Sequence, residues 1–321
     1  MRLLTALCLC AYLLIDSENA ILRARDAMTL WYASVAPAMF PFFALLPALT
    51  DEDALSVYSR MFGKSMKKLF RISGASASPA LVGLLAGSPA GSTAVLRAFL
   101  KGAISRKDAR VLSALATGAS PVFIVSSVGE GMMNDVSLGV KLLACTGTAS
   151  FLTAFLVSRF CSSGENEFYV GEPSDHMPGA IREAVIGVLT VAGYMTAFSV
   201  FAGWLNPNVY AFFEVSGGCF VAAQKKSFVM AAAVIGFGGL CLTAQNIRNL
   251  GQAGVKAHEI VLMKAVTGLF SASLGAAFSV LPSFSFRMPL DAYRTSCVLA
   301  LMMALLCVIY RLFKRRRVYS F

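Results

Sequence analysis

The chain has 321 residues, of which 57% are apolar and only 14% charged, and its mean hydropathy is +0.69. A soluble domain is about 45–50% apolar and about 25% charged, so this composition excludes an ordinary water-soluble protein and predicts one whose partner is the lipid bilayer. The net charge of +11 does not indicate a nucleic-acid partner, because the basic residues form short runs between apolar segments, where membrane topology places them.

Ten apolar segments follow one another along the chain. In order, they cover residues 1–15, 28–50, 75–100, 111–128, 138–158, 184–205, 209–223, 229–247, 260–281 and 296–313. A spanning helix needs roughly 20 apolar residues, so the predicted fold class is an all-α polytopic membrane protein. The first segment is interpreted as a retained helix and not as a signal peptide, because no clear small-residue cleavage site precedes Asp16.

A polar connecting loop over residues 161–183 separates five apolar segments from the next five. Its Ser, Gly, Glu and Pro content is typical of a linker. The first membrane half is therefore expected at 1–160, and the second at 184–321, which ends in a basic cytosolic tail. We expect the two halves to be related, because the third segment of each is interrupted by glycine and a further glycine follows each break at the same distance, Gly102 and Gly251.

The distribution of Lys and Arg predicts the topology. If all ten segments cross the membrane, the basic residues divide evenly between the two sides. If 75–100 and 229–247 are re-entrant hairpins, nearly all the basic residues fall on the inner side, as the positive-inside rule requires. The sequence thus predicts about eight spanning helices and two broken hairpins, with both termini inside. This count implies parallel repeats, although the inverted repeats that many carriers have stay open.

The glycine-rich breaks are the first candidates for a substrate site. A broken helix presents free N–H groups and a positive dipole end at membrane depth, where a carboxylate or phosphate can bind. Paired breaks in two halves are typical of a carrier's binding site, whereas close helix packing through small residues is the alternative. The candidate substrate-binding residues at the two breaks are Gly87, Ser88, Pro89, Gly91, Thr93, Gly236, Gly238 and Gly239.

Three polar residues in the second half are further substrate-binding candidates. Glu214 lies within a short apolar segment, and a carboxylate at membrane depth is costly and usually functional. It could bind a coupling proton or a sodium ion, or pair with a lysine; the alternative is a loop-end glutamate. Gln245 and Asn246 follow the second break and suit hydrogen bonding to a polar ligand or between helices.

Arg97 and Lys264 are candidates for compensating the charge of an anionic substrate. Both lie within apolar segments, and both could instead extend to the membrane interface. The chain lacks the HExxH, GxSxG and P-loop motifs, so it is not expected to be an enzyme. No metal site and no cofactor is expected, apart from the coupling proton or sodium ion that stays open. Homo-oligomerisation is also left open.

An ordered set of motifs covers most of the chain and resembles the YlbJ-type sporulation integral membrane proteins, which carry a nucleoside-recognition Gate domain. The motifs are VAPAMFPFFALLPAL (35–49), LLAGSPAGS (84–92), GAISRKDARVLSALATGASPVFIVSSVG (102–129), FFEVSGG (212–218) and IGFGGLCLTAQN (235–246).

The resemblance implies a multi-pass protein of endospore-forming bacteria, located in the outer forespore membrane and implicated in moving dipicolinic acid into the developing spore. It also implies an architecture like that of nucleoside carriers, with re-entrant hairpins that meet within the membrane. Dipicolinate is a planar dianion, so its carrier must supply positive charge or helix N-termini. We therefore expect a carrier for a small anionic metabolite. A structural scaffold of the spore envelope and a nucleoside-type transporter are the alternatives.

Overall fold

A computed structural model describes residues 2–161 and 179–280, and within these ranges the regular structure is entirely helical. The expected segment 296–313, the basic tail and most of the connecting loop lie outside the described residues. The helical elements are α1 (Arg2–Ile15), α2 (Ser17–Leu30), η1 (Trp31–Val35), α3 (Ala36–Leu49), α4 (Glu52–Ser65), η2 (Met66–Phe70), η3 (Gly74–Ser76), α5 (Ala77–Ala86), α6 (Ala90–Leu100), α7 (Arg106–Leu115), η4 (Phe123–Met132), α8 (Val136–Phe160), α9 (Ala180–Ala202), α10 (Pro207–Tyr210), α11 (Val215–Gln224), α12 (Phe228–Phe237), α13 (Gly239–Gln252) and α14 (Ala257–Val280).

Among the described residues, four helices are long and apolar enough to cross a membrane, or five if a strongly bent pair counts as one span. The four are Val136–Phe160, Ala180–Ala202, Phe228–Gln252 and Ala257–Ser279, and the bent pair is Glu52–Phe70 with Gly74–Ala86, which meet at 103°. Large side chains such as Leu189 and Leu269 are more than half exposed on these helices, as a surface that faces lipid tails permits. The chain is therefore a polytopic helical membrane protein, as predicted.

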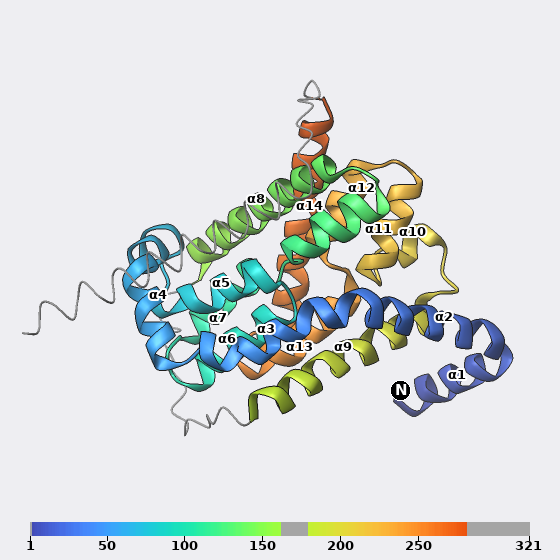
Figure 1. The fold of residues 1–321 in the computed structure, drawn as a ribbon, viewed down its shortest axis with the longest axis horizontal. Coiled ribbons are helices and arrows are strands. Elements are labelled where there is room, and N and C mark those ends of the chain that lie inside the picture. Colours follow the sequence, from blue (N-terminus) through green and yellow to red (C-terminus); the bar gives the residue numbers. More distant parts are fainter. Residues whose placement is uncertain (1, 162–178, 281–321) are drawn as a thin grey trace, which may run out of the picture.

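Two groups of helices form the molecule. One is the nearly continuous helix α2–η1–α3, which packs along α9 (Figure 1). Pro41 and Pro47 lie inside α3, and the π-helical turn η1 precedes it. A wider turn of this kind helps to accommodate the hydrogen bonds that proline removes. The other group contains α8, α12 and α14, which pack against one another, together with the short helices around them.

A helical hairpin lies where the first re-entrant hairpin was predicted. Helices α5 and α6 pack against each other on either side of a turn at Gly87, which has a φ of +71°. Their approach depends on small residues, because a Cβ atom at Gly91 would lie 2.6 Å from the Cα of Gly83 and would overlap the carbonyl oxygen of Ala116. The cluster of small residues between residues 83 and 91 thus lets the hairpin close tightly.

The second predicted hairpin, 229–247, is wrong in its position. Helices α12 and α13 do not fold back on each other; they continue as one candidate span, Phe228–Gln252, interrupted only at Gly238 and Gly239. Both glycines have positive φ values, +79° and +71°, a conformation that breaks the hydrogen-bond ladder without reversing the chain. A comparable interruption separates α7 from η4, where residues 116–120 are not helical.

The chain does fold back at 209–223, which was expected to be a span. The side chain of Asn206 caps α10 and that of Glu214 caps α11, so two helices start within a few residues of each other. The turn is tight, because a Cβ at Gly218 would meet the carbonyl oxygen of Ala211. This segment, and not 229–247, supplies the second short helical hairpin.

The two basic linkers, 101–107 and 225–226, lie at opposite ends of the molecule. Gly254, just after α13, lies against the side chain of Arg106, which begins α7. Because α12 and α13 form one span, the start of α12 and the preceding Lys225 lie at the other end. The expectation that both linkers share one side is therefore wrong; the charge count depended on folding 229–247 back on itself.

We expect single cysteines introduced at Lys107 and at Lys226 in a cysteine-free background to react with a membrane-impermeant maleimide from opposite sides of the membrane. A third cysteine at Lys256 is the control and should react from the same side as that at Lys107, because Gly254 contacts Arg106. Labelling of Lys107 and Lys226 positions from one side would restore the double-hairpin topology predicted from charge.

Candidate functional site

The interruptions in four elements meet near the centre of the fold. In the first half, the turn of the α5–α6 hairpin binds the α7–η4 break, because the N–H of Ser88 donates to the carbonyl oxygen of Gly118 at 2.7 Å. In the second half, the α10–α11 turn binds the α12–α13 break, and the N–H of Leu240 donates to the carbonyl oxygen of Phe212 at 2.8 Å. Each hairpin thus satisfies backbone groups that a broken helix leaves unpaired.

A side-chain hydrogen bond joins the α5–α6 turn to α13 at this centre. The hydroxyl of Ser88 donates to Oδ1 of Asn246 at 2.7 Å, and both residues are buried. The Nδ2 group of Asn246 and Oε1 of the neighbouring Gln245 are buried without a protein partner. Buried polar atoms are normally satisfied, so these two atoms mark places where water or a polar ligand can bind. Both residues were predicted from the sequence.

Glu214 is the buried acid of the site. Its side chain is 4% exposed, and its two carboxylate oxygens accept hydrogen bonds from the N–H groups of Ser216, at 3.0 Å, and Gly217, at 2.6 Å. A carboxylate in this position satisfies two free donors at the start of α11 and complements the positive end of the helix dipole. Its helix is therefore capped by an acid that also lines a cavity.

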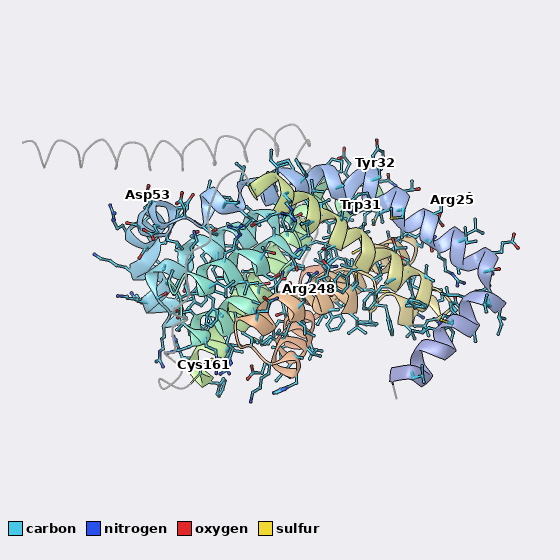
Figure 2. All side chains as sticks on the ribbon, turned by 90° about the horizontal axis from the view of Figure 1, so that it is seen from below. Arg25, Trp31, Tyr32, Asp53, Cys161 and Arg248 are labelled. Carbon is cyan, nitrogen blue, oxygen red and sulfur yellow. The ribbon has the colours of Figure 1, made fainter. Side chains whose placement is uncertain are left out.

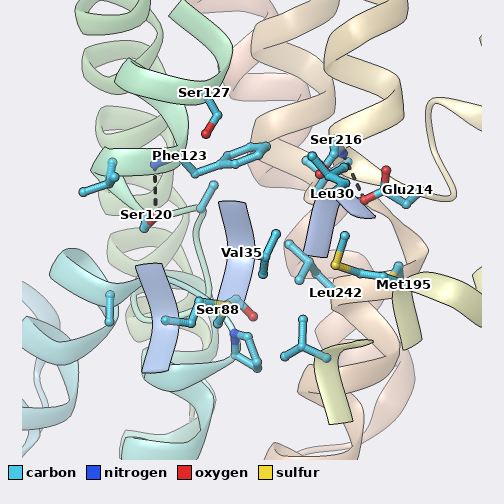
Figure 3. A pocket seen from close by; sticks show the side chains of 18 of the residues that line it. Leu30, Val35, Ser88, Ser120, Phe123, Ser127, Met195, Glu214, Ser216 and Leu242 are labelled. Atoms are coloured by element: carbon cyan, nitrogen blue, oxygen red, sulfur yellow. Dashed lines mark hydrogen bonds between the residues drawn. The ribbon is translucent and has the colours of Figure 1, made fainter. Parts of the chain in front are cut away.

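The central cavity, of about 130 Å³, lies between the α2–η1–α3 helix and the two hairpin turns. Figure 3 shows Ser120 and Ser127 on one side of it, with Glu214 and Ser216 opposite. Apolar side chains form the rest of its wall. Its lining residues include Leu30, Val35, Met39, Ser88, Pro89, Ser120, Phe123, Ser127, Met195, Glu214, Ser216, Cys241 and Leu242.

A second cavity, of about 220 Å³, lies on the α6 side of the first. It is named the polar cavity here because charged and neutral polar side chains line part of its wall. Arg97 pairs across it with Glu183 of α9. The amide of Asn249 donates to the hydroxyls of Ser92, at 3.0 Å, and Thr93, at 3.1 Å. Arg248, which Figure 2 shows on α13, lines the same cavity, as do Gln245 and Tyr194.

The third cavity, of about 280 Å³, lies on the other side of Glu214. Its polar lining comes from Arg23 and Asp26 of α2, Ser199 of α9, and Tyr210. Arg23 is held by an ion pair with Asp16 at 3.1 Å. Glu214 lines both this cavity and the central one, and so separates the two.

The three cavities follow α9 in sequence. The polar cavity contacts this helix from Glu183 to Tyr194, the central one at Val191 and Met195, and the third from Met195 to Gly203. Those contacts cover about 20 residues, or roughly 30 Å of helix, which is the thickness of a bilayer's hydrocarbon core. A chain of cavities thus runs the length of a candidate membrane span.

Three predicted site residues have other surroundings. Gly91 packs against Gly83 and Ala116, and Gly236 packs against Ser271 of α14, so both serve close helix packing. Lys264 is buried and donates to the carbonyl oxygen of Thr117, and it lines none of the three cavities. Its predicted role beside an anionic substrate therefore lacks the required geometry.

Arg248 and Asn249 line the polar cavity but were not among the site residues predicted from the sequence. They follow Gln245 by one turn of α13, so the three share a helix face. The polar face of this helix was the available signal, because Gln245, Arg248, Asn249 and Gln252 repeat at helical spacing after an apolar run.

Paired helical hairpins that meet two broken helices, beside helices able to cross a bilayer, define a polytopic membrane protein with an internal cavity series. The chain is similar to the sporulation integral membrane protein YlbJ of Bacillus subtilis (strain 168), with 21% identity over 306 residues, covering 78% of this chain and 75% of the relative. This similarity confirms the YlbJ-type relationship that the motifs indicated. No family model and no solved structure matches the chain.

Proposed function

We propose that this protein is a membrane carrier that moves a small anionic metabolite during spore formation. The observation that carries the proposal is the series of three cavities along α9, with Glu214 between two of them. An alternating-access carrier in one of its states has a solute path that side chains close at some points. Such a path would be seen as a series of separate cavities. The spore context comes from the printed name of the relative, a sporulation integral membrane protein.

The proposed architecture has eight spans and two re-entrant hairpins, arranged as inverted repeats. In each repeat, a hairpin precedes a broken helix and a long helix: α5–α6, α7–η4 and α8, then α10–α11, α12–α13 and α14. The opposite placement of the two basic linkers supports inversion. The remaining spans among the described residues are α1, α2–η1–α3 and α9. The segment 296–313, which the sequence predicted as a further span, lies outside them.

The polar cavity supports an anionic substrate. Arg97 and Arg248 line it together with neutral donors at Thr93 and Asn249, and guanidinium groups bind carboxylates through paired hydrogen bonds. Glu183 holds the Arg97 side chain in this structure, so an entering carboxylate would exchange with that of Glu183. Dipicolinate, a dianion with two carboxylates on a flat ring, is the substrate that the family resemblance favours.

A nucleoside is the second candidate substrate. Among the residues that the structure describes, no cationic side chain lines the central cavity, whose polar groups are the hydroxyls of four serines and the carboxylate of Glu214. Those groups can bind sugar hydroxyls, and the apolar wall can accept a neutral ring.

The outer forespore membrane is the proposed location. A scaffold role in the spore envelope would not explain why the protein contains a series of cavities.

The proposal is tested by measuring dipicolinate per spore, and in the whole culture, after deletion of the gene in its spore-forming host. Normal synthesis with dipicolinate-poor spores, restored by the wild-type gene, is the expected result. The purified protein in liposomes should also take up labelled dipicolinate in preference to uridine. Normally filled spores together with uridine uptake would replace the proposed substrate by a nucleoside, and absence of all uptake would favour the scaffold.

A further inference from the structure

Lys264 is a buried cation that the substrate path does not use. It lies on α14, its side chain is 4% exposed, and its ammonium donates to the carbonyl oxygen of Thr117. No carboxylate of the described residues forms an ion pair with it. An unpaired ammonium at membrane depth is costly, and such groups are retained where they act.

The surroundings of this ammonium are the ends of two half-helices. Thr117 lies two residues beyond Leu115, the last residue of α7, so its carbonyl group belongs to the α7–η4 break. On the other side, a Cβ at Gly238 would lie 3.5 Å from the Lys264 Nζ atom, and Gly238 caps the C-terminal end of α12. Lys264 therefore lies where the C-terminal ends of α7 and α12 come together.

Both ends carry partial negative charge. The last carbonyl groups of a helix lack intrahelical partners, and the dipoles of the preceding turns add to their charge. Carriers with broken helices coordinate their coupling sodium ion or proton with unwound carbonyl groups and the C-terminal ends of half-helices. In this chain, a side-chain ammonium already lies between those groups.

We propose that Lys264 is a built-in cation, which fills the place of a bound sodium ion and holds the two helix breaks together. The inference rests on the proposed carrier function and deepens it by excluding sodium as the coupling ion. Neither flux nor stability of the wild type should depend on sodium, because the ammonium of Lys264 already occupies the place beside the carbonyl oxygen of Thr117.

Removal of the ammonium should create a sodium site. In Lys264→Ser, the carbonyl oxygen of Thr117 and the free end of α12 lose their cation, and oxygen ligands of this kind suit a small hard cation. We expect the variant to unfold at lower temperature than wild type in choline chloride, and to regain several degrees when sodium chloride replaces choline chloride at equal ionic strength. Its flux should fall in choline and recover partly in sodium.

The test measures thermal unfolding of purified protein and dipicolinate uptake by liposomes, each in sodium chloride and in choline chloride. Lys141→Ser is the matched control, since this lysine also lies on a long helix, α8, and its variant should show no difference between the salts. Wild-type uptake or stability that requires sodium would overturn the inference and leave the carrier intact. So would a Lys264→Ser variant that equals wild type in choline, or one destabilised equally in both salts. Wild-type protein that takes up nothing in either salt would instead count against the carrier, and the unfolding data would still test the cation site.

Discussion

Replacing Glu214 with alanine should lower dipicolinate uptake roughly 10- to 100-fold while the protein still folds. Dipicolinate is a dianion that only accepts hydrogen bonds, so Glu214 can stabilise it only by donating the coupling proton that this residue is proposed to carry. A hydrogen bond to a charged group contributes about 1.5–3 kcal/mol, and each 1.4 kcal/mol is about a tenfold change in an equilibrium constant. The carboxylate lies between the central cavity and the third one, so a solute on the proposed path would have to pass it. Initial uptake rates in liposomes of equal protein content measure the effect.

The same substitution removes a helix cap, and a matched variant separates the two effects. Ser227 caps α12 by accepting the N–H of Met230 at 3.2 Å and lines none of the three cavities. Ser227→Ala should therefore cost about 1 kcal/mol of stability, as loss of a cap typically does, with uptake unchanged. If both variants lose uptake to the same extent, Glu214 acts only by starting α11 and has no part in the solute path.

The class of fold and the presence of helix breaks could be predicted because both depend on local chemistry. A high content of apolar residues indicates that the chain lies in a lipid bilayer. A glycine with a positive φ interrupts a helix wherever it occurs. The turn at Gly87 and the interruption at Gly238 were found in this way. Such a local pattern indicates where a helix is interrupted. It does not indicate the direction in which the chain continues after the interruption.

The direction after each break depends on packing, which the sequence does not display. At Gly87 the chain reverses, because Gly83 and Gly91 let α5 and α6 come together; at Gly238 it continues straight on. The distribution of basic residues led to the prediction that the chain reverses within 229–247, which is the wrong place. A better signal was the shortness of 209–223, which cannot span a bilayer and which Glu214 divides by capping a new helix.

Site residues were predicted best where polarity conflicts with burial. Glu214, Gln245 and Asn246 are conspicuous in apolar segments, and all three are buried near cavities. Small residues carry no such signal, since glycine serves a ligand-binding break and a close helix contact equally well. Ser88 lines the central cavity, whereas Gly91 packs against backbone atoms, although they belong to one motif.

The packing role of Gly91 leads to the largest expected effect on stability. A methyl group there would overlap the carbonyl oxygen of Ala116 and lie 2.6 Å from the Cα of Gly83. Both obstacles are backbone atoms, which cannot rotate away as a side chain can. Gly91→Ala should therefore destabilise the protein by about 1–3 kcal/mol, the usual cost of overpacking, and thermal unfolding in detergent measures it.

A second glycine gives the control for this substitution. Gly193 lies in α9 with no atom within 4 Å of where its Cβ would be, so Gly193→Ala should be neutral or stabilising, since alanine favours a helix by about 1 kcal/mol over glycine. Displacing α6 should also move the Ser88 N–H away from the carbonyl oxygen of Gly118, now 2.7 Å apart, and so lower uptake in Gly91→Ala. Equal unfolding temperatures for both variants would mean that α5 and α6 do not pack closely, and the first hairpin would then lose its physical basis.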